Sequence, residues 1–234
     1  MTAADAAQQS REEGEVTRSH YHPIGIFFHW TMAAMVLFQL WWGWRTSWLP
    51  AGYDKLDAYG VHALVGAVLL VFAFMRAGWR CIAPFILPDL EDPEDMPGWQ
   101  HFAAQAVHVG LYVLMFVLPF TGWLMLSAAG GDSIRMAFGL ELPSLPFVAE
   151  LGFVERAHLE QWAETLHFWS VWAIMGLLAM HIGAALHHHF INQDDVLARM
   201  VPVLLSEAAA KRHLTRGNLD RPKEKQTPQP PRSR

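Results

Sequence analysis

Cysteine is almost absent from this chain, since Cys81 is the only cysteine in 234 residues. A single cysteine cannot form a disulfide within the chain, and it excludes a Cys-x-x-Cys-His attachment site for a covalently bound cofactor. It also excludes iron–sulfur clusters and zinc sites built from several thiolates. Any metal or cofactor must therefore be held by other side chains and by packing.

Charged side chains are missing from four long stretches of a sequence that is 53% hydrophobic. A helix that crosses a bilayer needs about 20 mostly apolar residues, and soluble domains rarely contain charge-free runs of this length. The sequence therefore predicts an all-α integral membrane protein, with four transmembrane helices in a bundle surrounded by lipid. The four spans are expected at about residues 23–44, 59–80, 99–127 and 161–190.

Polar segments flank this predicted four-span domain of residues 20–202. Residues 1–19 have few apolar side chains and are expected to be disordered, as is most of the charged, proline-rich tail at 203–234. The first apolar run is longer than the apolar core of a signal peptide, so we expect it to be retained as a span. Residues 128–159 mix prolines, acids and apolar side chains, which favours a small folded cap at the membrane surface.

Lysine and arginine are distributed unevenly between the two sides of the predicted bundle. Thirteen of the 17 lie before the first span, between the second and third spans, or after the fourth, and four lie in the other two connections. Cytoplasmic segments of membrane proteins carry the excess of these residues. Both termini are therefore expected to face the cytoplasm.

Two histidines lie in the last charge-free stretch, which runs from Thr165 to Gln193. His167 and His181 are fourteen residues apart. On a helix this spacing places them within roughly 40° of each other and about 21 Å apart along the axis. An imidazole in hydrocarbon needs a partner, which can be a neighbouring helix or a bound metal cofactor.

Two further histidines match these in depth. Span one runs outward with His29 early in it, and span four runs inward with His181 late in it, so both lie in the cytoplasmic half. Span two runs inward with His62 early in it, which brings this residue to the outer half with His167. Two histidine pairs at two levels are the geometry that two haems with two histidine ligands each require. Iron ligated in this way has no open position and favours one-electron transfer over oxygen binding.

Two other polar residues lie near the cytoplasmic level. Arg76, at the end of span two, could neutralise a haem propionate or act only as a positive anchor at the membrane edge. His108, in span three, could contact a haem edge or a quinone, or hydrogen-bond a neighbouring helix. The sequence alone does not distinguish a structural role from a functional one for either residue.

Several short motifs surround these residues. They are Phe28-His29-Trp30, His62 in a glycine-containing span that ends in Arg76, His108 with Leu111-Tyr112, Leu118-Pro119-Phe120-Thr121-Gly122-Trp123-Leu124, His181 followed by Ala184-Ala185-Leu186-His187-His188, and Leu197-Ala198-Arg199-Met200. Together they resemble the bacterial cytochrome b561 family over roughly residues 20–202, in order, spacing and flanking residues. The chain departs from that family at Leu166 and Phe168 beside His167, where relatives often carry tryptophan and glutamate.

The resemblance implies four transmembrane helices and two b-type haems in the bacterial inner (plasma) membrane. It pairs His29 with His181 and His62 with His167 as haem iron ligands, which agrees with the pairing by depth. It also implies electron exchange with the quinone pool, with ubiquinone as the redox partner. A periplasmic or membrane redox partner and a homodimer are left open by the sequence.

Three functions are compatible with these patterns. The leading hypothesis is a membrane electron carrier that connects the quinone pool with a donor or acceptor on the outer side. The second keeps the haems in a cytochrome b membrane-anchor subunit of a dehydrogenase or hydrogenase complex, with segment 128–159 as a docking surface. The third is a histidine-lined metal or proton transporter without haem, which is disfavoured because the spans lack the acids that such a path normally uses.

Overall fold

The computed structural model describes residues 22–87, 98–130, 132–192, 197, 200 and 201 of the chain. Segments 1–19 and 203–234, which were expected to be disordered, lie outside the described residues. Four long helices dominate the described part, and each contains a window long and apolar enough to cross a membrane. The predicted all-α, four-helix membrane architecture is confirmed.

The four helices contain the predicted spans and extend beyond them. They are α2 (Pro23–Ser47), α3 (Tyr53–Ile86), α4 (Gly98–Ala129) and α6 (Phe153–His187). The last residues of the predicted fourth span belong to a π-helical turn, His188–Asn192, that continues α6. α3 runs past its predicted end at residue 80 and through Pro84. This proline lies in the last turn, where its missing N–H removes only one hydrogen bond from the helix.

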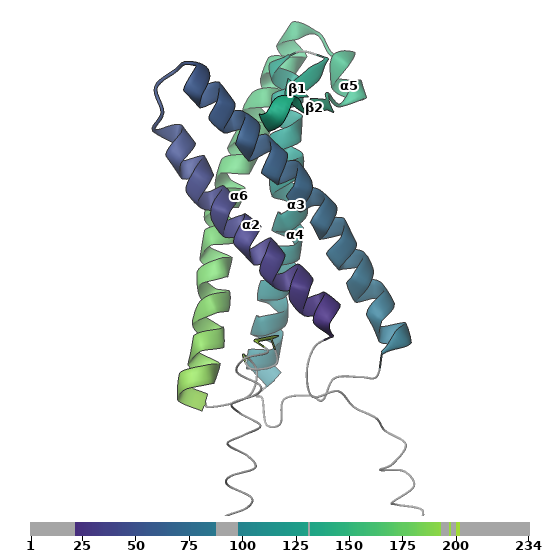
Figure 1. The fold of residues 1–234 in the computed structure, drawn as a ribbon, viewed down its shortest axis with the longest axis vertical. Coiled ribbons are helices and arrows are strands. Elements are labelled where there is room, and N and C mark those ends of the chain that lie inside the picture. Colours follow the sequence, from purple (N-terminus) through teal and green to yellow (C-terminus); the bar gives the residue numbers. More distant parts are fainter. Residues whose placement is uncertain (1–21, 88–97, 131, 193–196, 198–199, 202–234) are drawn as a thin grey trace, which may run out of the picture.

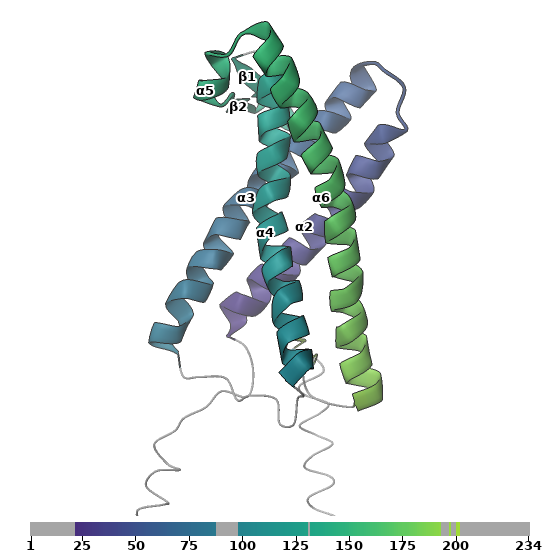
Figure 2. The ribbon, with the colours of Figure 1, turned by 180° about the vertical axis from the view of Figure 1, so that it is seen from behind.

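The helices form two antiparallel pairs, α2 with α3 and α4 with α6, which cross each other (Figures 1 and 2). α4 packs extensively against α6 and more locally against α3, whereas α6 approaches α2 and α3 at few backbone positions. α2 begins and α6 ends at the same end of the bundle (Figure 1). We call this end the base side.

A small folded unit fills the connection between α4 and α6, as the sequence predicted. Strand β1 (Ser133–Arg135) pairs antiparallel with β2 (Glu141–Pro143), with Ile134 opposite Leu142. The 3-10 turn η1 (Ala137–Gly139) and the short helix α5 (Pro146–Ala149) complete it. We call residues 133–149 the cap and this end of the bundle the cap side (Figure 1). The predicted segment also included residues 153–159, which instead form the first turns of α6.

The cap is attached to three of the four long helices. Its residues Leu145 and Val148 share a buried cluster with Leu124 and Ala128 of α4 and Ala163 of α6. Its 3-10 turn lies against α3 at Gly60, where an added Cβ would be 3.2 Å from the backbone nitrogen of Ala137. These contacts fix the cap across the end of the bundle.

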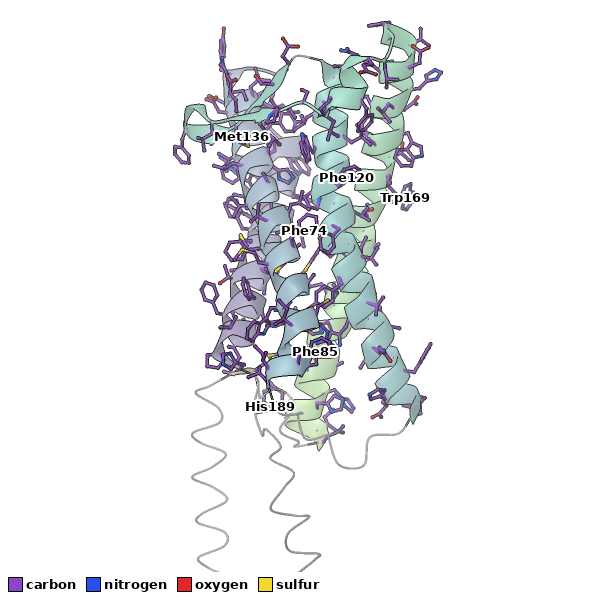
Figure 3. The ribbon with its side chains drawn as sticks, turned by 90° about the vertical axis from the view of Figure 1, so that its right-hand side faces the viewer. Phe74, Phe85, Phe120, Met136, Trp169 and His189 are labelled. Carbon is purple, nitrogen blue, oxygen red and sulfur yellow. The ribbon has the colours of Figure 1, made fainter. Side chains whose placement is uncertain are left out.

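Few residues of the long helices are fully buried inside the protein. Between 11% and 22% of the residues in each span window are buried inside the protein. Phe74, Phe120 and Trp169 are exposed side chains on three of these helices (Figure 3). Helices that are apolar on every face are stable in a bilayer, because lipid covers the side chains and each helix satisfies its own backbone hydrogen bonds.

Candidate functional site

Four histidines meet in two pairs at two levels of the bundle. The ring centres of His29 on α2 and His181 on α6 are 6.0 Å apart, and those of His62 on α3 and His167 on α6 are 6.4 Å apart. His62 and His167 form the cap-side pair, because α3 and α6 both begin at the cap side. His29 and His181 form the base-side pair. The structure thus brings together the residues of both predicted pairs, while their role as iron ligands stays a prediction.

The separation of the rings fits one iron between the two imidazoles of each pair. A metal–imidazole bond is about 2 Å long and the nitrogen lies roughly 1 Å from its ring centre, so two rings on opposite sides of one metal have centres about 6 Å apart. Both observed separations agree with this value. The rings also bridge helices whose backbones approach each other at few positions, since α6 packs mainly on α4.

The fourteen-residue spacing of the two α6 histidines recurs at these levels on the other three long helices. Fourteen residues return a helix to nearly the same face after about 21 Å. Each helix therefore presents one residue to each level. Given as cap-side then base-side residue, these positions are Gly43 and His29 on α2, His62 and Arg76 on α3, Gly122 and His108 on α4, and His167 and His181 on α6.

The two glycines let neighbouring helices approach the cap-side rings closely. A Cβ on Gly43 would lie 3.1 Å from Cε1 of His62, and a Cβ on Gly122 would lie 3.6 Å from Cε1 of His167. At Gly43 even an alanine would press on the imidazole. Each cap-side ring is therefore held against the backbone of an adjacent helix.

Thr121 on α4 fixes the orientation of His167. Its hydroxyl Oγ1 lies 3.0 Å from Nδ1 of His167 and donates to the backbone carbonyl of Val117 at 2.7 Å, with Leu118 O at 2.9 Å. Because the hydroxyl proton is directed to the backbone, Nδ1 of His167 is the donor to Oγ1. That tautomer leaves the Nε2 lone pair free to bind iron.

Gln39 and Trp42 tie α2 to α3 next to His62. The Gln39 amide Nε2 donates to the backbone carbonyl of His62 at 2.9 Å, and the Trp42 indole donates to the carbonyl of Ala58 at 2.9 Å. Within the described residues, two buried side-chain polar atoms have no hydrogen-bond partner, Gln39 Oε1 and His62 Nδ1. With Nε2 bound to a metal, Nδ1 of His62 would carry a proton and act as a hydrogen-bond donor. This level would then contain one buried donor, His62 Nδ1, and one buried acceptor, Gln39 Oε1, without partners in the described residues.

Arg76 lies at the base-side level, half-buried between three helices. Its Nε donates to the hydroxyl of Tyr112 at 3.1 Å, and its Nη1 donates to the carbonyl of Gly25 at 3.4 Å. Its Nη2 is 3.4 Å from Nδ1 of His29. The guanidinium also lies over the Tyr112 ring. Arg76 therefore contacts one of the paired histidines, while its pairing with a haem propionate stays a prediction.

His108 lies beside the base-side pair. Its ring centre is 5.1 Å from that of His181, and its side chain is exposed on the surface of the described bundle. His108 is therefore an accessible polar group next to one of the paired histidines.

An apolar layer separates the two levels. Val36, Leu69, Leu111 and Ile174, one from each long helix, form a buried cluster. Ile174 is seven residues from both His167 and His181, or about 10 Å along the helix from each. The two histidine pairs are therefore distinct sites with dry packing between them.

Some residues of the site were missed by the reasoning from sequence alone. Gly43 and Gly122 could have been found by extending the fourteen-residue spacing from His29 and His108. Thr121 and Gln39 had no such signal, because their roles depend on how the helices are rotated against each other. Polar residues such as these are common in membrane helices for structural reasons alone.

A bundle of four membrane helices with paired imidazoles at two levels defines a membrane cytochrome b. The comparison with known sequences agrees with this class. The sequence model of the family described as "Prokaryotic cytochrome b561" matches residues 20–203. The chain belongs to this family, and it is a multi-pass bacterial membrane protein that binds haem b.

Curated relatives match the chain over nearly their whole length. Cytochrome b561 homolog 2 of Escherichia coli (strain K12) is 32% identical over 191 residues, which cover 79% of this chain and 93% of the relative. Cytochrome b561 homolog 1 of the same organism is 28% identical over 188 residues, with 76% and 94% covered. Cytochrome b562 of Cereibacter sphaeroides is 26% identical over 189 residues, with 77% and 94% covered.

Proposed function

We propose that this cytochrome binds two haems b, each between two histidines, and exchanges electrons with the quinone pool. The observation that carries the proposal is the pair of ring separations, 6.0 Å for His29 with His181 and 6.4 Å for His62 with His167. Haem b held by these histidines would supply one-electron chemistry at iron, and ligation by both imidazoles of a pair would disfavour oxygen binding.

The protein's own part is to hold the imidazoles and keep water away. Thr121 accepts from Nδ1 of His167, which leaves Nε2 free to bind iron, and Gln39 ties His62 to α2. The apolar layer around Ile174 keeps the interior between the two levels dry. These contacts support two haems held in fixed positions and separated by about half the thickness of the membrane.

The base side is proposed to face the cytoplasm, with both termini on that side. The support is the excess of lysine and arginine in the segments that connect there, thirteen against four. The cap then lies on the periplasmic side of the inner membrane. A periplasmic or membrane redox partner would meet the cap-side haem first.

Quinone exchange is proposed at His108. Its exposed ring lies 5.1 Å from the ring of His181, so a quinone in the bilayer can meet a hydrogen-bonding group next to the base-side haem. His108 would hydrogen-bond and orient the quinone head group beside His181, the proposed ligand of the base-side haem.

The experiment uses purified protein, reduced without oxygen and mixed with a short-chain ubiquinone. We expect rapid reoxidation of the wild type. In H108L the rate should fall at least tenfold with haem content unchanged. The matched control is H101L, an exposed histidine seven residues away on the same helix, which should react like the wild type. Failure of the wild type to reduce ubiquinone would overturn quinone exchange, and equal rates in both variants would move it away from His108.

A second candidate function, a membrane-anchor subunit of a dehydrogenase or hydrogenase complex, is favoured by the cap. Phe138 in the cap is 91% exposed and has a left-handed backbone (φ 61°), which a bulky residue rarely adopts. A single exposed aromatic residue is common on protein surfaces, so the strained backbone at Phe138 is what singles this residue out as a candidate docking contact. Isolation of the native protein in mild detergent distinguishes the candidates, because an anchor subunit would copurify with its catalytic partner.

The metal-transport alternative has no geometric support in the described part of the chain. There, no group of three or more histidine, cysteine, aspartate or glutamate side chains is placed to hold one metal ion.

A further inference from the structure

The base-side level contains a cation that the cap-side level lacks. Arg76 is fourteen residues after His62 on α3, so it occupies at the base side the position that His62 occupies at the cap side. Its Nη2 lies 3.4 Å from Nδ1 of His29. The corresponding cap-side positions on α2 and α4 are occupied by Gly43 and Gly122.

The position of the guanidinium does not depend on His29. Tyr112 and Gly25 accept hydrogen bonds from Nε and Nη1, and the Tyr112 ring lies beneath the cation. When Nε2 of His29 binds iron, Nδ1 carries a proton and cannot accept from Arg76. The contact with His29 is then purely electrostatic, between a fixed positive charge and the ligand.

No aspartate or glutamate side chain offsets this charge within the described base-side half of the bundle. α2 and α4 contain no aspartate or glutamate, and neither do the described residues of α3 after Asp57 or those of α6 after Glu164. A guanidinium cannot lose its proton in a protein, so the charge is permanent. In a half-buried site it is screened less than a surface charge.

The charges of the cap side are arranged differently. Asp57 and Glu164, which precede the cap-side pair on α3 and α6, are exposed. Arg45 lies near the cap-side end of α2, and its guanidinium lies over the ring of Trp42 on the same helix. The described contacts of the two cap-side rings are to each other, to the Thr121 hydroxyl, to the backbone of Leu118 and to the glycine positions Gly43 and Gly122, all of them neutral.

From this asymmetry we infer that Arg76 sets the order of the two reduction potentials, with the base-side haem easier to reduce than the cap-side haem. The inference rests on the proposed two-haem function. A fixed positive charge beside an iron ligand favours the ferrous state, which carries one positive charge fewer than the ferric state. An electron shared between the two sites therefore resides at the base side at equilibrium. Arg76 acts on the iron through the field at His29, without touching substrate.

The test is a potentiometric measurement by visible and EPR spectroscopy on the purified, haem-loaded protein. H181A and H62A identify the base-side and cap-side signals by the haem that each variant loses. In the wild type we expect two one-electron steps, the base-side haem being reduced at the higher potential. In R76Q the ferrous-to-ferric ratio of the base-side haem at a fixed potential should fall at least tenfold, which corresponds to a shift of 59 mV for one electron. The cap-side haem should shift less than threefold.

Two further variants separate charge from structure. R76K keeps the charge but loses the hydrogen-bonding fork, so its base-side potential should stay close to that of the wild type. R80Q removes an exposed arginine one turn further along α3, and its effect should be less than threefold. Should R76Q lose the base-side haem altogether, the wild-type order of the two potentials, together with the potentials of R76K and R80Q, still tests whether the charge of Arg76 sets that order.

The outcomes distinguish this inference from the proposed function. One haem per chain would contradict the proposed function before any potential is compared. Two haems with the cap-side haem at the higher potential would overturn the inference and leave the proposed function intact. Equal shifts in R76K and R76Q would also overturn it, because the effect would then come from packing rather than charge.

Discussion

The two histidine levels are built from equivalent positions on the same four helices, yet they differ in character. At the cap side, the rings of His62 and His167 lie against Gly43 and Gly122, and Thr121 fixes one ring through a neutral hydrogen bond. At the base side, the same positions on α3 and α4 are occupied by a cation and an exposed imidazole.

The same fourteen-residue helix spacing can therefore produce two sites with different surroundings. Close backbone contact and a folded cap make the cap-side site rigid and enclosed. The polar, lipid-accessible surroundings of the base-side pair suit exchange with a molecule in the bilayer. Substitutions that act at one level only test whether the two sites differ in this way.

The largest effect is expected from removing one ligand at a time. H181A should abolish the base-side haem and H62A the cap-side haem, each leaving about one haem per chain, because the apolar layer around Ile174 separates the sites. Haem-to-protein ratios and low-spin EPR signals measure this. Two low-spin haems in both variants would show that the pairing is wrong.

The next effect is at Thr121, a neutral partner of Nδ1 of His167, whereas the described contact of Nδ1 of His29 is with the cationic Arg76. T121V keeps the volume but removes the acceptor for Nδ1 of His167. Affinity for the cap-side haem should fall about 10-fold to 100-fold, the range typical of lost partners of metal-binding histidines. T121S retains the hydroxyl and should bind both haems as the wild type does. Equal loss at both levels in T121V would indicate general destabilisation instead.

A smaller effect is expected from closing the space beside His62. In G43A the new methyl group would lie 3.1 Å from Cε1 of the ring, so the imidazole must shift by a few tenths of an ångström, at a cost of order 1 kcal/mol. The EPR signal of the cap-side haem should change while the base-side signal stays the same. The control G25A places a methyl group 3.5 Å from Nε1 of Trp79, an ordinary contact. A change of the base-side signal in G43A would contradict the assignment of levels.

The smallest effect on the haems is expected at Gly60, where the cap meets α3. In G60A the new Cβ would be 3.2 Å from Ala137 N and 3.3 Å from Met136 C, both backbone atoms. The cap must move, so limited proteolysis between residues 133 and 149 should become faster. Both haem signals should be retained. Loss of the cap-side haem would show that the cap holds the cap-side site together.

The fold was largely readable from the sequence, because charge-free stretches long enough to span a bilayer have few alternatives. The histidine pairs were readable too, since depth follows from helix direction and the distance of each histidine from its helix end. The ends of α3 and α6 were not, because a helix can continue past the bilayer into water without a change in apolar pattern. Pro84 inside α3 and the early start of α6 at Phe153 are examples.

The surroundings of the paired histidines were predicted less well than the pairs. The contact of Arg76 with His29 and that of Thr121 with His167 depend on helix rotation and crossing, which hydropathy does not encode. In membrane bundles most faces are apolar, so polarity alone does not show which face points inward. The fourteen-residue spacing was visible on α6, but its recurrence on the other three helices becomes meaningful only once the levels are aligned.

The most direct test of the account is the haem content of the purified wild-type protein, measured together with its low-temperature EPR spectrum. The account predicts two haems b per chain, both low-spin with two histidine ligands and with distinguishable signals. One haem per chain, or a high-spin signal from an iron with an open coordination position, would contradict it.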